Sequence, residues 1–206
     1  MDPIRYFVAL ILVISLPPLF LYWLLIHPLV NFWRGKGIGF TYGVVLTIIV
    51  TGMVGLFSMR HFLLAFDFGT SYLLIGLGVL CLALAGSMRF ALHKQLTLKT
   101  LLGLPEIAPD RYPRRLMTEG IFARIRHPRY VQLLLALFGY SVIANYLASY
   151  LAVFLWAPGL YLIVILEEKE LRAHFGEAYE EYCRRVPRFL PKLSETAAAN
   201  PPPKLD

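Results

Sequence analysis

Apolar residues gather in long blocks that are separated by short polar segments. The blocks cover residues 4–30, 40–59, 71–92, 131–146 and 150–166. A predominantly apolar run of about 18 or more residues can cross the hydrocarbon core of a membrane as a helix. The first three blocks reach this length, and the last two are shorter but nearly continuous. We therefore predict an all-α, polytopic membrane protein with about five transmembrane helices.

The connections between the blocks set the expected organisation. Only residues 147–149 separate the last two blocks, so these helices should form an antiparallel hairpin around a tight turn. The first block is interrupted by Pro17 and Pro18, is too long for a signal peptide and has no small-residue cleavage site. No internal repeat is present, which indicates one domain.

The chain divides into four expected segments. Residues 1–92 hold three N-terminal spans, and residues 93–118 are expected to form an interfacial helix followed by a proline-containing loop. Residues 119–193 contain the hairpin and a C-terminal helix. Residues 194–206, rich in Ala and Pro, are expected to be a disordered tail.

The distribution of basic residues predicts an orientation. With five spans, the basic segments 89–129 and 169–204 fall on the same side as the loop that follows the first span, and only Arg5 and Arg60 of the 20 Lys and Arg lie opposite. By the positive-inside rule the N-terminus is outside and the C-terminus cytoplasmic, in the inner membrane of a bacterium or the endoplasmic reticulum of a eukaryote. Anionic lipid headgroups account for the net charge of +7 without nucleic acid.

Composition narrows the class further. The chain is 58% hydrophobic, whereas soluble domains are nearer about 45–50% apolar. Cys81 lies within a span and Cys183 on the predicted cytoplasmic side, so the two cannot pair. The sequence has no metal-ligand spacing such as C-x-x-C, and no metal site is predicted.

A first polar patch precedes the fourth block. Pro128 suits the first turn of a helix, which places Arg126 and His127 at its N-terminus, where backbone N–H groups favour an anion. Arg126 adds a planar donor fork that suits a carboxylate. The structural alternative is that these residues simply flank the span and His127 caps the helix.

A second polar patch follows the fifth block. Its apolar residues recur at the spacing of one helix face and are Leu171, Phe175, Tyr179 and Tyr182. Glu167 shares this face and is expected to point inward, where a carboxylate needs a cationic partner. That partner is Arg126 or His127 in a structural pair, or a positively charged ligand. Glu168 has the same choice but faces inward less directly.

The two patches together resemble the isoprenylcysteine carboxyl methyltransferase family and, more loosely, the phospholipid N-methyltransferases. Residues 120–130 read G-x-F-A-x-x-R-H-P-x-Y, and residues 167–191 read E-E-x-x-L-x-x-x-F-G-x-x-Y-x-x-Y-x-x-R-V-P-R-F-L-P. The resemblance covers about residues 118–191, with both motifs in the family's order and separated by the expected hairpin.

The resemblance implies a methyltransferase that binds S-adenosylmethionine at the cytoplasmic end of the hairpin, covered by the C-terminal helix. The residues implied in binding are Arg126, His127, Pro128, Tyr130, Glu167, Glu168, Tyr179 and Tyr182. This cofactor carries a carboxylate, an ammonium and a sulfonium, so a basic patch and an acid suit it. A lipophilic acceptor would enter sideways from the bilayer.

Methyl transfer is an in-line displacement, so alignment and desolvation are the main tasks of the protein. Arg126 and Glu167 are the expected catalytic residues. Arg126 would orient a carboxylate acceptor, which needs no base, and Glu167 would be the general base for an amine or thiol. A prenylcysteine-type carboxylate, a membrane lipid and a hydrophobic small molecule all stay open as acceptors.

Two departures from the family pattern concern the acceptor more than the cofactor. Gln132 stands where the family commonly has a small residue, two positions after the motif tyrosine, and it would reshape the acceptor pocket. The usual G-P-Y opening of the first motif reads G-I-F at residues 120–122. Competing interpretations are an NADPH-dependent membrane reductase of the sterol-reductase kind and a non-catalytic membrane protein with a degenerate site.

Overall fold

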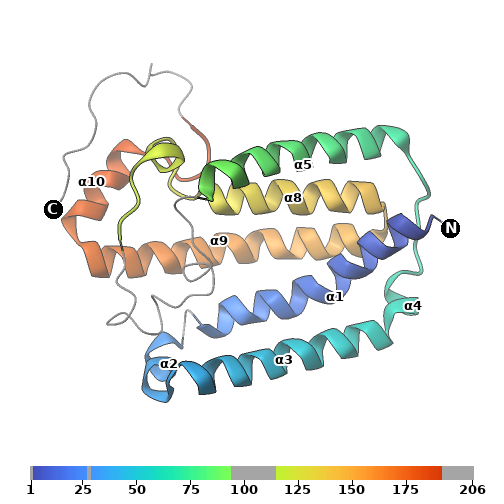
Figure 1. Ribbon diagram of the computed structural model, residues 1–206, viewed down its shortest axis with the longest axis horizontal. Helices are drawn as coiled ribbons and strands as arrows, with labels where there is room; N and C mark the ends of the chain where they lie inside the picture. Colours follow the sequence, from blue (N-terminus) through green and yellow to red (C-terminus); the bar gives the residue numbers. More distant parts are fainter. Residues whose placement is uncertain (1, 27–28, 94–114, 192–206) are drawn as a thin grey trace.

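The computed structural model describes residues 2–26, 29–93 and 115–191, and within these ranges the regular structure is helical (Figure 1). The helices, in chain order, are α1 (Pro3–Ile26), α2 (Val30–Lys36), α3 (Ile38–Ser58), α4 (Arg60–Leu63), α5 (Tyr72–Leu92), the 3₁₀ helix η1 (Gly120–Ala123), α8 (Pro128–Ala144), α9 (Leu147–Phe175) and α10 (Glu177–Arg185). The predicted all-α class is confirmed. Most of the predicted interfacial segment and the predicted disordered tail lie outside the described residues.

Four of these helices, α1, α3, α5 and α9, are long and apolar enough to cross a membrane. Helix α8 is apolar but has 17 residues, which corresponds to a length of ~26 Å, close to the ~30 Å of a bilayer core. Figure 1 shows α8 running side by side with α5 and α9 through the same layer. The chain is therefore a multi-pass membrane protein, and its orientation stays a prediction.

The prolines of the first block do not interrupt its helix, and the predicted position of the hairpin turn is wrong. Helix α1 continues through Pro17 and Pro18, because prolines are tolerated in membrane helices where neighbouring elements compensate for the lost hydrogen bonds. The hairpin turn lies at residues 145–146 rather than 147–149. Asn145 has φ 56°, in the left-handed region that Asn adopts more readily than most residues, and this conformation ends α8.

Helix α9 also extends beyond its predicted end, to Phe175, and passes through Pro158 without interruption. Gly176, at φ 55° and ψ −127°, then ends α9 and starts α10. The apolar residues predicted to line one helix face therefore belong to two helices. They still gather in one cluster, in which Tyr179, Tyr182 and Val186 are buried against Leu171 and Phe175.

Close backbone contacts hold the bundle together. A Cβ atom at Gly139 of α8 would lie 2.9 Å from the carbonyl oxygen of Gly78 in α5, so only glycine fits at this crossing. Helix α1 packs on α3, α8 and α9, with Phe20 against Gly159 of α9. The Trp156 indole N–H donates to the Leu16 carbonyl at 2.8 Å, which joins α9 to α1.

Polar contacts around Arg5 hold together the end of the bundle where the N-terminus and the hairpin turn lie (Figure 1). Arg5 is 3% exposed, forms an ion pair with Asp67, donates to Thr70 Oγ1 at 3.2 Å and lies over the Tyr146 ring at 5.5 Å. The Asn145 amide donates to the Gly69 carbonyl at 2.8 Å. The charge of Arg5 is thus compensated inside the protein.

The crossing of α5 and α8 gives a direct stability test. We expect Gly78→Leu to lower the free energy of unfolding by about 1–3 kcal/mol or more, because a side chain there meets Ile143 and the Gly139 carbonyl. Gly76→Leu on the same helix is the control, since apart from its chain neighbours and the backbone of its own helix nothing lies within 4 Å of its Cβ position. Thermal unfolding in detergent micelles measures both, and equal melting temperatures for the two variants would contradict this packing.

Candidate functional site

The segment before α8 and the segment after α10 are joined through their backbones. Pro128 is the first residue of α8, as predicted, and His127 precedes it. The Arg126 N–H donates to the Pro187 carbonyl at 2.9 Å, and the His127 N–H donates to the Arg188 carbonyl at 3.1 Å. The Tyr182 hydroxyl adds a bond of 2.7 Å to the Phe122 carbonyl. The two sequence motifs therefore meet in space.

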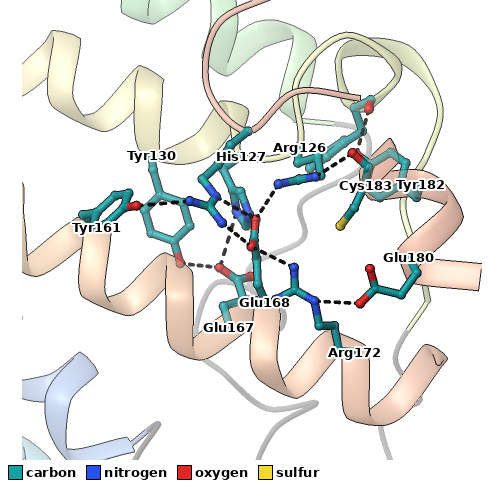
Figure 2. A network of polar contacts seen from close by, with 12 residues as sticks. Arg126, His127, Tyr130, Tyr161, Glu167, Glu168, Arg172, Glu180, Tyr182 and Cys183 are labelled. Carbon is teal, nitrogen blue, oxygen red and sulfur yellow. Dashed lines mark hydrogen bonds and ion pairs between the residues drawn. The ribbon is translucent and has the colours of Figure 1, made fainter. Parts of the chain in front are cut away.

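Glu168 is the centre of the polar cluster drawn in Figure 2, and its side chain has no exposed surface. Its Oε1 accepts from Arg126 Nη2 at 3.0 Å and lies 3.1 Å from His127 Nε2. Arg188 binds both carboxylate oxygens, Oε1 through Nε at 3.0 Å and Oε2 through Nη2 at 2.7 Å. Arg172 lies 3.6 Å from Oε2. Cations from three parts of the chain thus converge on one buried carboxylate.

Glu167 has the more open position of the two acids. Its side chain is 34% exposed, Oε2 accepts from the Tyr130 hydroxyl at 2.8 Å, and His127 Nδ1 lies 3.8 Å away. The expectation that Glu167 faces inward more directly than Glu168 is therefore wrong. That expectation placed Glu167 on the face of Leu171, but Leu171 is only partly buried. The buried positions of α9 instead include Leu160, Val164 and Glu168, four residues apart, so Glu168 shares the inner face.

Arg126 is engaged on both terminal nitrogens. Nη1 donates to the Cys183 carbonyl at 3.0 Å and Nη2 to Glu168, while the side chain is 10% exposed. Nε is buried and has no hydrogen-bond partner within the described part of the chain. In this arrangement Arg126 joins α8, α9 and α10, and its predicted contact with a ligand carboxylate stays a prediction.

Tyr179 and Tyr182 pack behind the cluster. Both are buried, and burial raises the pKa of each phenol well above its usual value, so both remain neutral hydroxyls. Their predicted place in the cofactor site stays a prediction. Arg188 belongs to the cluster but was not predicted as a site residue, although it lies within the second motif. Arg188 follows Glu168 by 20 residues, and no local sequence pattern indicates that the two are in contact.

An apolar groove of about 450 Å³ lies between α8 and α9, directly beside the polar cluster. Its walls are formed by Tyr130, Val131, Leu134, Leu135, Phe138, Ala157, Leu160, Tyr161, Val164 and Phe189. Phe138 and Tyr161 are half-exposed, at 44% and 48%, so the groove opens toward the side of the bundle. Gln132, which was expected to reshape the acceptor pocket, is not among these lining residues.

Two of the comparisons with known proteins name a methyltransferase. A family model described as phospholipid methyltransferase matches residues 73–178, just over half of the chain. The chain is 36% identical over 80 residues to the protein-S-isoprenylcysteine O-methyltransferase of Schizosaccharomyces pombe, which covers 38% of this chain and 34% of the relative.

A second relative has a different description. It is the cobalt-zinc-cadmium resistance protein CzcN of Cupriavidus metallidurans, 35% identical over 79 residues, which covers 38% of this chain and 37% of that protein. The chain thus spans only about a third of the length of these curated relatives. No solved structure matches it.

The cluster around Glu168 predicts a large loss of stability when its charge is removed. We expect Glu168→Gln to cost about 3–5 kcal/mol, because three arginines would lose their buried counter-ion. Glu181→Gln is the control, since Glu181 forms exposed ion pairs on α10 and its substitution should leave stability nearly unchanged. Thermal unfolding in micelles compares them, and a Glu168→Gln protein as stable as Glu181→Gln would refute the structural role of Glu168.

Proposed function

The chain belongs to the phospholipid methyltransferase family, and we propose that it is an S-adenosylmethionine-dependent methyltransferase that acts on a lipophilic acceptor. The observation that carries the proposal is the direct junction of the polar cluster with the apolar groove. Tyr130 belongs to both, since its ring lines the groove and its hydroxyl binds Glu167. A polar donor and an apolar acceptor would meet at such a junction.

The charged residues of the cluster are of the types that could bind the charged groups of S-adenosylmethionine. When bound, S-adenosylmethionine supplies an electrophilic methyl group on a sulfonium. Glu167, whose carboxylate is partly exposed, would hold the ammonium group, and His127 lies between the two acids. The buried Nε of Arg126 is a donor with no partner in the described residues, which favours an additional acceptor near it.

Glu167 and Arg126 have different proposed roles. Glu167 faces the groove through Tyr130, so it is positioned to take a proton from an amine or thiol acceptor, or to fix the cofactor when the acceptor is a carboxylate. Arg126 touches Glu168 and the Cys183 carbonyl, which supports a positioning role that keeps α8, α9 and α10 together. The groove would keep water from the reacting atoms.

The choice of cofactor is tested by ligand binding. We expect S-adenosylhomocysteine to raise the melting temperature of the full chain in micelles, because a ligand that binds only the folded state stabilises it. NADPH at the same concentration should leave the melting temperature unchanged. Calorimetric titration provides the affinity. Stabilisation by NADPH alone would favour a reductase, and stabilisation by neither compound would favour a non-catalytic protein.

The proposed site residues are tested by methyl transfer. With labelled cofactor and a membrane lipid extract, we expect Glu167→Gln to lower the rate about 100-fold or more. Its melting temperature should stay near that of the wild type, because Glu167 is partly exposed. Glu177→Gln, an exposed acid on α10, is the matched control. We expect Arg126→Ala to abolish transfer as well, with normal membrane insertion but reduced stability. Wild-type turnover in Glu167→Gln would remove it from the site.

A further inference from the structure

Cys183 of α10 lies beside the polar cluster, but its thiol takes no part in the contacts described above. The Cys183 carbonyl accepts from Arg126 Nη1 at 3.0 Å, and the thiol forms no disulfide. The side chain is partly buried and packs against Tyr179, Tyr182 and Val186. Its partial exposure leaves the residue accessible to a small solute.

Two buried donors beside this thiol have no hydrogen-bond partner within the described residues. One is the hydroxyl of Tyr179, a residue that is 1% exposed. Tyr179 precedes Cys183 by one turn of α10, so the two side chains share a helix face. The other donor is Nε of Arg126, whose guanidinium is held against Cys183 by its bond to the carbonyl. Buried polar groups nearly always have a partner, so these two donors suit one shared acceptor.

The charges around the thiol favour an oxygen atom on the sulfur. Figure 2 shows the sulfur on the side of Cys183 that faces Arg172. The Arg172 guanidinium interacts electrostatically with the thiol, and the Tyr179 hydroxyl interacts with both the thiol and Arg126. Burial raises the pKa of Tyr179 well above its usual value, so the hydroxyl keeps its proton and can donate. Glu168, the buried acid nearby, is already paired with Arg126.

We propose that Cys183 is a site of reversible oxidation, at which the oxygen of a cysteine sulfenate is held by the Tyr179 hydroxyl and Arg126 Nε. The oxidant is a hydroperoxide. The thiol proton passes to water, and the sulfur attacks the terminal peroxide oxygen, so that an S–O bond forms and the O–O bond breaks. The departing oxygen takes a proton and leaves as water or an alcohol. Sulfur is oxidised by two electrons, and the peroxide is reduced by two.

A low-molecular-weight thiol reverses the oxidation. Its sulfur attacks the sulfenic sulfur, which releases water and forms a mixed disulfide. A second thiol then restores Cys183 and leaves with the first as a disulfide. The donors of the pocket bind the oxygen of the sulfenate more strongly than a neutral acceptor, because hydrogen bonds to a charged acceptor are the stronger ones.

Oxidation of Cys183 also has a consequence for the cofactor, which rests on the proposed function. The sulfenate oxygen takes up Nε of Arg126, the donor that favours an additional acceptor in the cofactor site. Oxidation therefore lowers the affinity for S-adenosylmethionine, and bound cofactor protects the thiol. The oxidation of Cys183 itself does not depend on the choice of cofactor.

Trapping with dimedone tests the oxidation site without methyl transfer. The full chain in detergent micelles is treated with hydrogen peroxide, quenched with catalase and labelled with dimedone, and its peptides are analysed by mass spectrometry. We expect Cys183 to be labelled about tenfold more than Cys81, which is buried in the apolar helix α5. Glutathione added before dimedone should restore the thiol. Equal labelling of both cysteines, absence of label at Cys183, or a product that glutathione does not reduce overturns the proposal.

A tyrosine variant tests the pocket. Dimedone added at increasing delays after catalase measures the lifetime of the sulfenic acid. We expect Tyr179→Phe to shorten this lifetime about threefold or more, because one bond to the oxygen is lost. In the reduced protein the same variant should keep the wild-type melting temperature, since its hydroxyl has no partner among the described residues. Tyr140→Phe, a half-exposed tyrosine on α8, is the matched control, and an unchanged lifetime in Tyr179→Phe overturns the pocket.

The two proposals fail separately. We expect S-adenosylhomocysteine to slow the oxidation of Cys183, and Cys183→Ser to make its binding insensitive to peroxide. A sulfenic acid at Cys183 whose lifetime depends on Tyr179, in a protein that does not bind S-adenosylhomocysteine, would support the oxidation site and reject the methyltransferase. Binding of S-adenosylhomocysteine by a protein whose Cys183 resists peroxide would support the cofactor site and reject the oxidation site.

Discussion

The site depends on the burial of one carboxylate. Glu168 has no exposed surface, and a buried charge of this kind costs several kcal/mol unless cations and hydrogen bonds compensate it. The compensation comes from the segment before α8, from α9 itself and from the segment after α10. Three parts of the chain thereby converge on one carboxylate, as Figure 2 shows.

This constraint explains how a charged site and an apolar groove share a wall. The charges end at Glu168 and Glu167, the hydroxyls of Tyr130 and Tyr161 come next, and the aliphatic residues of α8 and α9 follow. Polarity thus falls in steps along the hairpin. The methyltransferase proposed above would need this gradient, because its proposed donor is water-soluble and its proposed acceptor is not.

Much of this arrangement could be predicted from the sequence. The apolar blocks predicted the membrane spans, and Pro128 predicted the start of α8. The order of the two motifs predicted that they lie together in the fold. The inner acid was predicted wrongly, because Glu167 was oriented by Leu171, which is only partly buried, whereas the buried face of α9 runs through Leu160, Val164 and Glu168. The contact of Arg188 with Glu168 depends on the backbone pairing of residues 126–127 with 187–188, which no local pattern encodes. The turn at Asn145 depends on a single left-handed residue.

The contacts of Arg5, at the end of the bundle where the hairpin turn lies, restrict the order in which the bundle can assemble. Arg5 is synthesised before its ion-pair partner Asp67 and before Tyr146, whose ring it contacts. Its charge therefore stays uncompensated while α1 and α3 are made, since chains emerge from the N-terminus. The final position of α1 becomes fixed only when the hairpin turn arrives. The contacts of Arg5 can therefore form only after α3, α5 and α8 have been made, although α1 precedes all three in the chain.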